Sequence, residues 1–445
     1  MASEPSFRDR ASLLLSGLPQ GREVRAYLDQ FSADGPDGEG ACFAVVKVGG
    51  ALMAAALETL ADRLTLLQAL GLRPVVVFGA GPQLDRRLAE AGLGTERRDG
   101  LRVTPPAAMT VVAEEAARAG LALVEAMRAR GGNAVLAPPG LVTARLLDEA
   151  RYGRVGEVAR VDTEALRGLL ASGTLPLIGC AQLDEAATLL NVNADDVARR
   201  VALAMRPQKI VFLTGTGGLL DDEGRIVDSI NLATDEAGLR EAPWLTGGMR
   251  LKVDQISALL DELPLSTSVS MTDAENLVRE LFTHGGAGTL IRRGERVVIE
   301  DHADVGVLTP LIERAFGRAL APGYWHGVDP AYVVRTERTR AAALVTRMPG
   351  GLHCLDKFAV DPDARGEGLA KTVWAVLRER SPRLVWRSRA ANPFNAFYAG
   401  QADGFLRRGP WWVFWHGDAD EAALAAAPGL AARPPDFEDH EGYEG

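Results

Sequence analysis

Lysine and glycine residues in the first half of the chain are spaced in a way that suits the binding of an anion. Lys47 lies at the end of the apolar run CFAVVKV, residues 42–48, and Gly49 and Gly50 follow it directly. A second apolar run, RPVVVFG at residues 73–79, leads into glycines in the same way. Glycine turns at the ends of neighbouring strands can point backbone N–H groups into one crevice, and a lysine beside them adds positive charge. The pattern predicts a phosphate site.

The second turn, GAGPQLD at residues 79–85, does not complete the dinucleotide-binding fingerprint. Gly79 and Gly81 match the first two glycines of Gly-x-Gly-x-x-Gly. Leu84 occupies the third position, where Gly or Ala would let the helix approach the strand. We therefore interpret the two turns together as a backbone cradle for phosphates, not as a nicotinamide or flavin site.

Three further segments extend this candidate site. Asn191, Asn193 and Asp195 alternate in NVNAD, so an extended backbone would present all three on one side. The alternative is that Asn193 or Asp195 caps the helix that follows. The run VFLTGTGGLLDD, residues 211–222, is another predicted strand that ends in glycines, and Lys252 lies near the start of a predicted helix.

A second group of residues suits the binding of a pyrophosphate. The apolar run LHCLDKFAV, residues 352–360, precedes Arg365, Gly368 and Ala370, which fit the pattern (Q/R)-x-x-G-x-(G/A) at a helix start. Small residues there leave backbone N–H groups free, and the positive end of the helix adds to the attraction. The alternative is a glycine-rich helix cap, and the strand before the turn favours the pyrophosphate site.

Basic and aromatic residues follow on the next predicted strand. Arg387 and Arg389 are two residues apart, so both face one side of the sheet, where each could grip one carboxylate of a dicarboxylate. Lys357 on the neighbouring strand could join them, and the alternative is an exposed basic face. Tyr398 could protonate a departing thiolate or could be a core aromatic residue, and the residues alone support both interpretations.

The elements that would position these residues alternate between strands and helices. Amphipathic stretches at 52–70 and 106–130 predict helices. Buried strands are predicted at residues 42–48, 73–79, 174–180, 208–215 and 265–271. This alternation predicts an α/β fold, a mostly parallel sheet with helices on both faces in three layers. A smaller mixed α/β domain is predicted to follow.

The 445 residues are too many for one compact core, so two or three domains are expected. The clustered glycines and charges of residues 284–306 predict an edge strand followed by a linker. The parts of the chain are therefore expected at residues 1–40 (an N-terminal segment), 41–296, 303–420 and 421–445 (a loose acidic tail).

The overall composition excludes several functions. A net charge of −10 argues against a general nucleic-acid binder. Cys42, Cys180 and Cys354 show no CxxC spacing, so we expect buried thiols, not a disulfide framework or a metal site. No apolar run is long enough to span a bilayer, and the acidic N-terminus fits a presequence poorly. A cytoplasmic enzyme without membrane partners is expected.

The motifs of the first half resemble the amino acid kinase fold, specifically N-acetyl-L-glutamate kinases. The matching segments occur in the family's order: KVGG, GAGPQLD, GLRVT, NVNAD, LTGTGGLLD, GGMRLK and ELFTHGGAGTLI. The resemblance implies transfer of the ATP γ-phosphoryl group to N-acetylglutamate, with Mg²⁺ arriving on ATP. It assigns catalysis to Lys47, Lys252 and Asp195, substrate binding to Gly49, Gly50, Ala80, Gly81, Arg102 and Asn191, and nucleotide binding to Thr214, Gly215, Thr216, Gly217 and Gly218.

The second half resembles the GNAT acetyltransferase domain of the vertebrate-like N-acetylglutamate synthases, through LDKFAV, GEGLAKTVW and WRSR. The whole chain is thus similar to bifunctional N-acetylglutamate synthase/kinases of arginine biosynthesis. The resemblance makes Tyr398 the general acid. It assigns acetyl-CoA binding to Phe358, Ala359, Val360, Arg365, Gly366, Gly368 and Ala370, and glutamate binding to Lys357, Arg387, Arg389 and Asn392.

The resemblance also implies acetyl-CoA and ATP-Mg as cosubstrates, L-glutamate and N-acetyl-L-glutamate as ligands, L-arginine as an effector and a homo-tetramer. The run EVRAYLDQFS fits the family's N-terminal helix, so residues 1–40 are expected to be an N-terminal helical segment for oligomerisation. Two alternatives stay open. The family's kinases often have histidine where Phe78 stands and aspartate where Gly215 stands, so the first domain could be only an arginine-binding regulatory module. A kinase followed by an inert binding domain is weakened because Arg365, Arg387, Arg389 and Tyr398 are all present.

Overall fold

The computed structural model describes residues 42–94, 96–282, 288–364, 368–392 and 394–438. The chain divides into two compact units at Arg293 and Gly294. The predicted N-terminal helical segment, residues 1–40, lies outside the described residues. None of the described helices is both long and apolar enough to cross a membrane.

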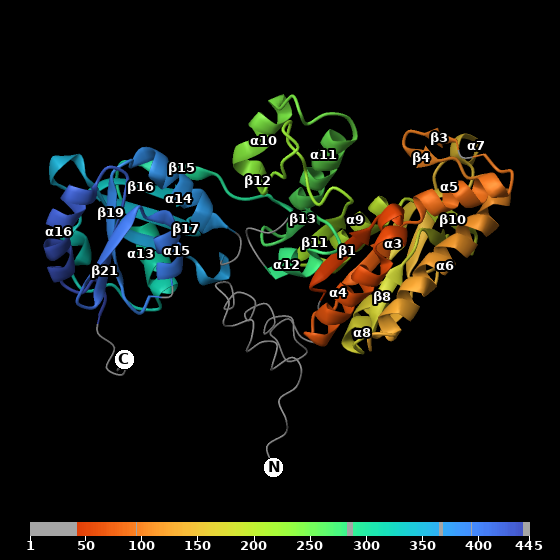
Figure 1. Ribbon diagram of the computed structural model, residues 1–445, viewed down its shortest axis with the longest axis horizontal. Helices are drawn as coiled ribbons and strands as arrows, with labels where there is room; N and C mark the ends of the chain where they lie inside the picture. The colour runs from red at the N-terminus through yellow and green to blue at the C-terminus, as the bar shows by residue number, and fades with distance from the viewer. Residues whose placement is uncertain (1–41, 95, 283–287, 365–367, 393, 439–445) are drawn as a thin grey trace, which may run out of the picture. The chain divides into compact units, whose positions relative to one another are not determined.

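The first unit is built on an eight-stranded sheet (Figure 1). In spatial order its strands are β12 (Ser229–Asn231), β14 (Thr289–Arg292), β13 (Ser268–Thr272), β11 (Lys209–Leu213), β1 (Ala44–Val48), β2 (Val75–Phe78), β8 (Leu175–Ile178) and β5 (Ala134–Leu136). All pairs are parallel except β13 with β14. The predicted fold class, a mostly parallel sheet, is confirmed.

Helices cover both faces of this sheet because its strands are apolar on both sides. Val46 and Val76 pack toward α4 (Leu57–Ala69), α6 (Met109–Arg128) and α12 (Leu277–Phe282). Their neighbours Val45 and Val75 pack on the other face, toward helices that include α8 (Thr163–Ala171), α9 (Ala194–Met205) and α11 (Gly247–Asp261). Among the described residues of this unit, the further α-helices are α3 (Gly50–Ala55), α5 (Gly81–Glu90), α7 (Glu149–Tyr152) and α10 (Leu232–Glu241).

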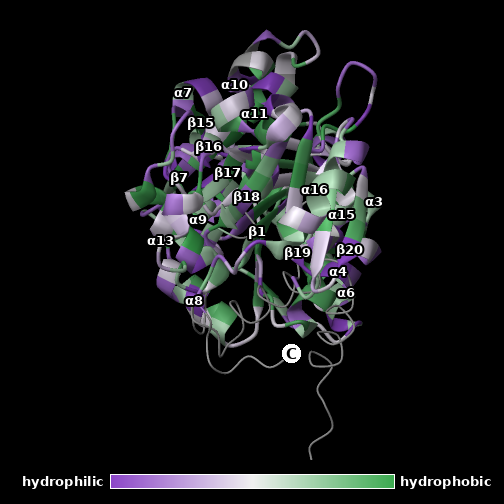
Figure 2. Ribbon diagram, turned by 90° about the vertical axis from the view of Figure 1, so that its left-hand side faces the viewer, coloured by the Kyte–Doolittle hydropathy of each residue, from purple (hydrophilic) through white to green (hydrophobic). Residues whose placement is uncertain are grey.

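A small closed barrel and a two-stranded ribbon lie beyond the main sheet of this unit. The barrel consists of β10 (Leu189–Val192), β7 (Val155–Val161), β6 (Val142–Leu146) and β9 (Ala181–Leu183). The ribbon is made by β3 (Arg97–Arg98) and β4 (Leu101–Arg102). Figure 2 shows hydrophobic residues concentrated in the strands and hydrophilic residues on the outer turns of helices.

The second unit is a seven-stranded sheet in which only β18 and β19 run parallel. The order is β15 (Val297–Glu300), β16 (Pro330–Thr336), β17 (Ala341–Arg347), β18 (His353–Val360), β19 (Leu384–Arg389), β21 (Trp411–His416) and β20 (Gly404–Arg408). Residues of α14 (Leu369–Arg380) and α15 (Asn395–Gln401) pack in one cluster on one face. The other face packs against α13 (Val305–Phe316) and α16 (Asp420–Ala432).

Two sequence-based boundaries need correction. The segment 297–302, expected to be linker, begins with β15, which pairs with β16 at the edge of the second sheet. The loose tail predicted for residues 421–445 is wrong up to residue 438. Helix α16 forms despite Pro428, because Ala423, Ala427 and Leu430 are buried against the sheet. Residues 439–445 lie outside the described part of the chain.

The turns after β1 and β2 meet so closely that Gly50 has no room for a side chain. A Cβ atom on Gly50 would lie 2.6 Å from the Gly81 nitrogen and 2.9 Å from the Ala80 Cα. Both are backbone atoms that cannot rotate away. Gly49, next to it, has no atom within 4 Å of such a Cβ. One glycine of the pair is therefore required by packing.

We expect Gly50→Ala to reduce the free energy of unfolding of the first unit by about 1–3 kcal/mol, the usual cost of overpacking. Gly49→Ala is the matched control and should change it by less than about 0.5 kcal/mol. Chemical denaturation of the two variants measures both values. Equal destabilisation by the two substitutions would contradict the steric explanation.

Candidate functional site

The two glycine turns form one crevice at the carboxyl ends of β1 and β2. These strands are parallel neighbours, with Val48 beside Phe78. The Gly79 N–H donates to the Val48 carbonyl at 3.0 Å, and the Gln83 Nε2 donates to the Gly50 carbonyl at 2.6 Å. Helices α3 and α5 begin at Gly50 and Gly81, so both direct their N-terminal N–H groups toward this edge. The predicted convergence of the turns is observed.

Lys47, Asp195 and Lys252 form one electrostatic group. Lys47 Nζ lies 2.9 Å from Asp195 Oδ1. Burial lowers the pKa of Lys252; Asp195 opposes this shift and Lys47 adds to it. Two lysines that come from β1 and α11 therefore share the field of one carboxylate. Such a pair of cations with one anion carries net positive charge, which suits a transferring phosphoryl group.

The capping alternative is correct for Asn193 but not for Asp195. Asn193 is the N-cap of α9, and its Oδ1 accepts the Asp195 N–H at 2.9 Å. Asp195 lies in the first turn, and its side chain turns toward Lys47. Asn191 instead donates from Nδ2 to Thr104 Oγ1 at 3.0 Å, which ties the barrel to the segment after β4. The three alternating residues thus have three different roles.

Arg102, which was predicted to bind the substrate, is buried beside the second glycine turn. Its Nη2 donates to the Gly81 carbonyl at 3.0 Å, and its Nη1 pairs with Asp85. Burial raises the pKa of Asp85, but the hydrogen bond and charge of Arg102 outweigh it and lower the pKa below its ordinary value. Asp85 was missed from the sequence, although it belongs to the quoted motif GAGPQLD. Asp85 follows Gly81 by four residues, which puts both on one face of α5. This spacing could have indicated that the carboxylate lies near the turn.

The segment predicted to bind the nucleotide, residues 214–218, directly follows β11, whose neighbour in the sheet is β13. The Thr214 N–H donates to the Thr272 carbonyl at 2.7 Å, and Thr216 Oγ1 donates to the Gly218 carbonyl at 2.9 Å. Gly217 has φ +74°, a conformation that favours glycine. A Cβ on Gly217 would lie 3.3 Å from Asp273 Oδ2, so this carboxylate borders the loop. Asp273 directly follows the buried strand β13, and this position could have marked it as a candidate site residue.

Phe78 and Gly215, the two departures from the kinase motif, lie in different surroundings. Phe78 is fully buried, and its ring fills the space that side chains at Gly120 and Gly179 would occupy. It is therefore a core residue of the α6 face. Nothing lies within 4 Å of the Cβ position of Gly215, so the site there is open.

The second unit has a break in strand pairing where acetyl-CoA is predicted to bind. β18 and β19 pair only through His353, Cys354 and Leu355. The register of β17 with β18 shifts beyond Leu355, which makes a bulge at Asp356. Gly368 caps α14 with φ +70°, as a tight turn into a helix requires. Arg365 and Gly366 lie outside the described residues, whereas Ala370 is in the first turn of α14.

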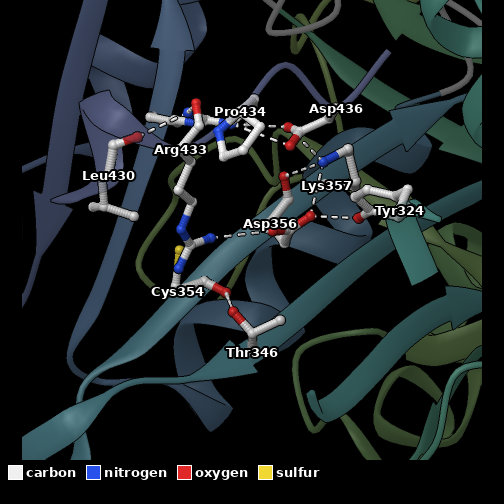
Figure 3. A network of polar contacts seen from close by, with 10 residues as sticks. Tyr324, Thr346, Cys354, Asp356, Lys357, Leu430, Arg433, Pro434 and Asp436 are labelled. Carbon is white, nitrogen blue, oxygen red and sulfur yellow. Dashed lines mark hydrogen bonds and ion pairs between the residues drawn. The ribbon is translucent and has the colours of Figure 1, made fainter. Parts of the chain in front are cut away.

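Lys357 and Arg387 come together around one carboxylate, that of Asp436 (Figure 3). Lys357 Nζ lies 2.9 Å from Asp436 Oδ2 and 2.7 Å from Asp356 Oδ1. Arg387 Nη2 lies 3.1 Å from Asp436 Oδ1. Arg389 stands beside Arg387, with the two guanidinium carbons 5.1 and 4.3 Å from the Trp411 ring centroid. The predicted cationic cluster is present, and its anion is a residue that was missed.

Tyr398 does not join this cluster. It is 7% exposed and packs among Trp374, Trp386, Phe394 and Phe414. Burial raises the pKa of Tyr398, so the phenol stays protonated at neutral pH. Trp386 is in the same cluster as Tyr398, and Arg387 follows Trp386 on β19. Alternation along the strand therefore puts Arg387 and Tyr398 on opposite faces.

Asn392 lies in the turn that follows β19. Its Nδ2 donates to Ser388 Oγ at 2.8 Å, and its Oδ1 accepts the Phe394 N–H at 3.0 Å. Both bonds are local, so they fix the turn at the carboxyl end of β19. Unlike Lys357 and Arg387, Asn392 does not pair with Asp436 in the described part of the chain, so the structure brings together only part of the predicted glutamate-binding set.

Comparison with known proteins agrees with both units. The amino acid kinase family model matches residues 43–265, and the model for the N-acetyltransferase of N-acetylglutamate synthase matches residues 295–427. An acetylglutamate kinase of Xanthomonas campestris pv. campestris is 45% identical over 90% of this chain and 95% of its own length. The mitochondrial N-acetylglutamate synthase of Homo sapiens is 31% identical over 89% of this chain and 73% of its own length.

A solved structure supports the same fold. N-acetylglutamate synthase from Neisseria gonorrhoeae, complexed with coenzyme A and N-acetyl-glutamate, superposes with a TM-score of 0.63 at 20% identity, over 89% of this chain and 98% of that chain. The family expected from the motifs is confirmed by the two family models and by the relative of 45% identity. The chain belongs to the amino acid kinase family, in the group whose members carry the N-acetyltransferase domain of N-acetylglutamate synthase after the kinase domain.

Proposed function

We propose that the chain is a bifunctional enzyme of arginine biosynthesis. Its second unit acetylates L-glutamate with acetyl-CoA, and its first unit phosphorylates N-acetyl-L-glutamate with ATP. The observation that carries the kinase half is the group of Lys47, Asp195 and Lys252 at the glycine turns. A module that only bound arginine would not need two lysines held around one carboxylate, so the regulatory alternative is disfavoured.

Phosphoryl transfer asks the protein for positioning and charge neutralisation. An oxygen of the substrate's side-chain carboxylate attacks the γ-phosphorus, and the bond to the bridging β,γ-oxygen breaks as ADP leaves. Lys47 and Lys252 neutralise the charge on the transferring group, while Asp195 holds Lys47 in place. The N–H groups of the glycine turns bind phosphate oxygens. Arg102 and Asn191 hold the acetylamino acid, and residues 214–218 line the nucleotide, with Mg²⁺ arriving on ATP.

Acetyl transfer takes place at the gap between β18 and β19. The turn before α14 binds the pyrophosphate of acetyl-CoA, and the pantetheine extends along Phe358, Ala359 and Val360, which β19 does not pair. The glutamate amine, after losing a proton to a base or to water, attacks the thioester carbonyl. The carbon–sulfur bond breaks, and the thiolate takes its proton from Tyr398. The nitrogen releases its extra proton as the amide forms, and one proton returns to the Tyr398 phenolate, so the side chain ends the cycle neutral. The raised pKa of Tyr398 keeps that proton available.

The substrate carboxylates bind the basic residues Lys357, Arg387 and Arg389, and Asn392 orients the amino acid. L-Arginine is proposed as the effector of the first unit. A homo-tetramer, assembled through residues 1–40, and a cytoplasmic location complete the proposal.

Measuring both reactions on the purified chain, with and without arginine, tests the proposed function. If no CoA is released from acetyl-CoA and glutamate, the proposed acetyltransferase activity is wrong. If no acyl phosphate forms from ATP and N-acetylglutamate, the proposed kinase activity is wrong.

Lys47→Ala should reduce phosphoryl transfer by about a hundredfold or more, because a preorganised positive charge at the transferring group is lost. Acetyl transfer by the same preparation is the internal control and should stay within about twofold of wild type. Coupled assays of ADP and CoA release measure the two rates. Equal loss of both activities would indicate a structural role for Lys47.

Asp195→Asn should lower the pKa of Lys252 further, because this carboxylate is the group that raises it against burial and against Lys47. A lysine is charged below its pKa, so the alkaline loss of phosphoryl transfer should begin at a lower pH than in wild type. Carbon NMR titration of the lysine ε-carbons gives the pKa, and the kcat–pH profile gives its consequence. Asp254→Asn, an exposed change on the same helix as Lys252, is the control and should leave both unchanged.

Tyr398→Phe removes one hydroxyl and keeps the buried ring, so the aromatic packing should survive. We expect kcat for acetyl transfer to fall by about a hundredfold, with little change in KM for glutamate. Phosphoryl transfer and the unfolding midpoint serve as controls. A variant with wild-type acetyl transfer would show that Tyr398 is only a core residue.

A further inference from the structure

The carboxylate between Lys357 and Arg387 belongs to the chain itself (Figure 3). Asp436 lies 2.9 Å from Lys357 Nζ, and its two oxygens lie 3.1 and 3.2 Å from Arg387 Nη2. The two cations come from neighbouring strands, and both side chains are almost completely buried. Two buried cations therefore hold one carboxylate, with both of its oxygens on a single guanidinium nitrogen, as they could hold the carboxylate of a ligand.

The segment of residues 430–436 accepts hydrogen bonds from both Nη atoms of Arg387. Nη1 donates to the carbonyls of Leu430 and Arg433 at 2.8 and 3.2 Å, and Nη2 donates to the Pro434 carbonyl at 3.2 Å. A bidentate grip through Nη1 and Nη2 needs donors that these carbonyls and Asp436 now occupy. Substrate and segment therefore compete for these two nitrogens.

We infer that residues 433–438 are a tethered occupant of the glutamate site, which we call the C-terminal strap: the Asp436 carboxylate takes the place of a substrate carboxylate and leaves when glutamate binds. The inference rests on the proposed acetyl transfer and on the proposed roles of Lys357 and Arg387. It adds a competitor within the chain that sets the apparent affinity for the substrate.

Charge balance allows this exchange. Lys357 keeps a second partner, Asp356, whose carboxylate is buried and accepts a hydrogen bond from Tyr324. The ion pair of Asp356 with Arg433, at 3.3 Å, belongs to the strap and breaks when residue 433 moves away with it. When Asp436 leaves and a substrate carboxylate enters, one negative charge replaces another. The buried cations are then never left without an anion, which would be costly.

The contacts that anchor the strap away from Lys357 and Arg387 involve mainly its backbone and the Phe437 ring. The Ala321 N–H donates to the Asp436 carbonyl at 3.0 Å, the Glu438 N–H donates to the Ala319 carbonyl at 3.0 Å, and Arg318 donates to the Glu438 carbonyl. The Phe437 ring lies 4.8 Å from that of Phe316 and near the cations of Arg318 and Lys357. These contacts join the strap to the segment 316–321 and to single side chains, and no described strand of the seven-stranded sheet pairs with it. Substrate binding can therefore displace the strap while the sheet stays intact.

Asp436→Asn in the full chain tests the inference, because it removes the charge and keeps the shape. We expect KM for L-glutamate in acetyl transfer to fall by about tenfold, since the competent site is populated more often. KM for acetyl-CoA should not change. Glu438→Gln removes the same charge from an exposed side chain two residues further and should leave both KM values unchanged. Phe437→Ala loosens the anchor and should also lower KM for glutamate.

An unchanged or higher KM for glutamate in Asp436→Asn would overturn the inference. A wild-type chain that releases no CoA would instead contradict the proposed function. Hydrogen exchange on the wild-type chain gives a test that needs no variant. Saturating L-glutamate with CoA should increase exchange of the amides in residues 436–438, and unchanged or slower exchange there would also overturn the inference.

Discussion

The strands at the centre of each sheet are buried on both faces, and this constraint decides where chemistry can take place. Val45 and Val46 face opposite helical layers, so β1 has no solvent-facing side along its length. A polar side chain or a free N–H group is then available only where a strand ends or where pairing stops. In the first unit the carboxyl ends of β1, β2 and β11 provide such an edge. In the second unit the gap after Leu355 provides it.

Both candidate sites also hold their cations in place with carboxylates of the chain. Asp195 pairs with Lys47, Asp85 with Arg102, and Asp356 with Lys357. A buried cation without a partner would be costly, and each of these three cations has a carboxylate of the chain beside it. The carboxylates reduce the net positive charge of the site and define the geometry in which an incoming anion is received.

Spacing in the sequence was sufficient for the groups that lie at strand ends. Lys47 with its glycines, Asp195 before α9, and Arg387 with Arg389 were all indicated by residue type and by position after an apolar run. The carboxylate partners were not, because an ion pair depends on distance in space. Asp436 is 79 residues from Lys357 and lies in a stretch rich in Ala, Pro and acid, which is typical of a loose tail. Burial of Ala423, Ala427 and Leu430 orders that stretch, and composition alone does not show it.

The extra residue in β18 changes what a single insertion or deletion means there. Cys354 and Lys357 are three residues apart and yet belong to the same side of the sheet, because the bulge at Asp356 interrupts the alternation. Loss of Asp356 would restore regular pairing of β18 with β17 and would leave Lys357 opposite Leu344, on the same side of the sheet as Cys354. The extra residue therefore does not set the direction of the lysine; it adds a carboxylate 2.7 Å from Lys357 Nζ. A chain that is shorter here by one residue would keep the fold and the lysine and would lose the internal anion that holds it.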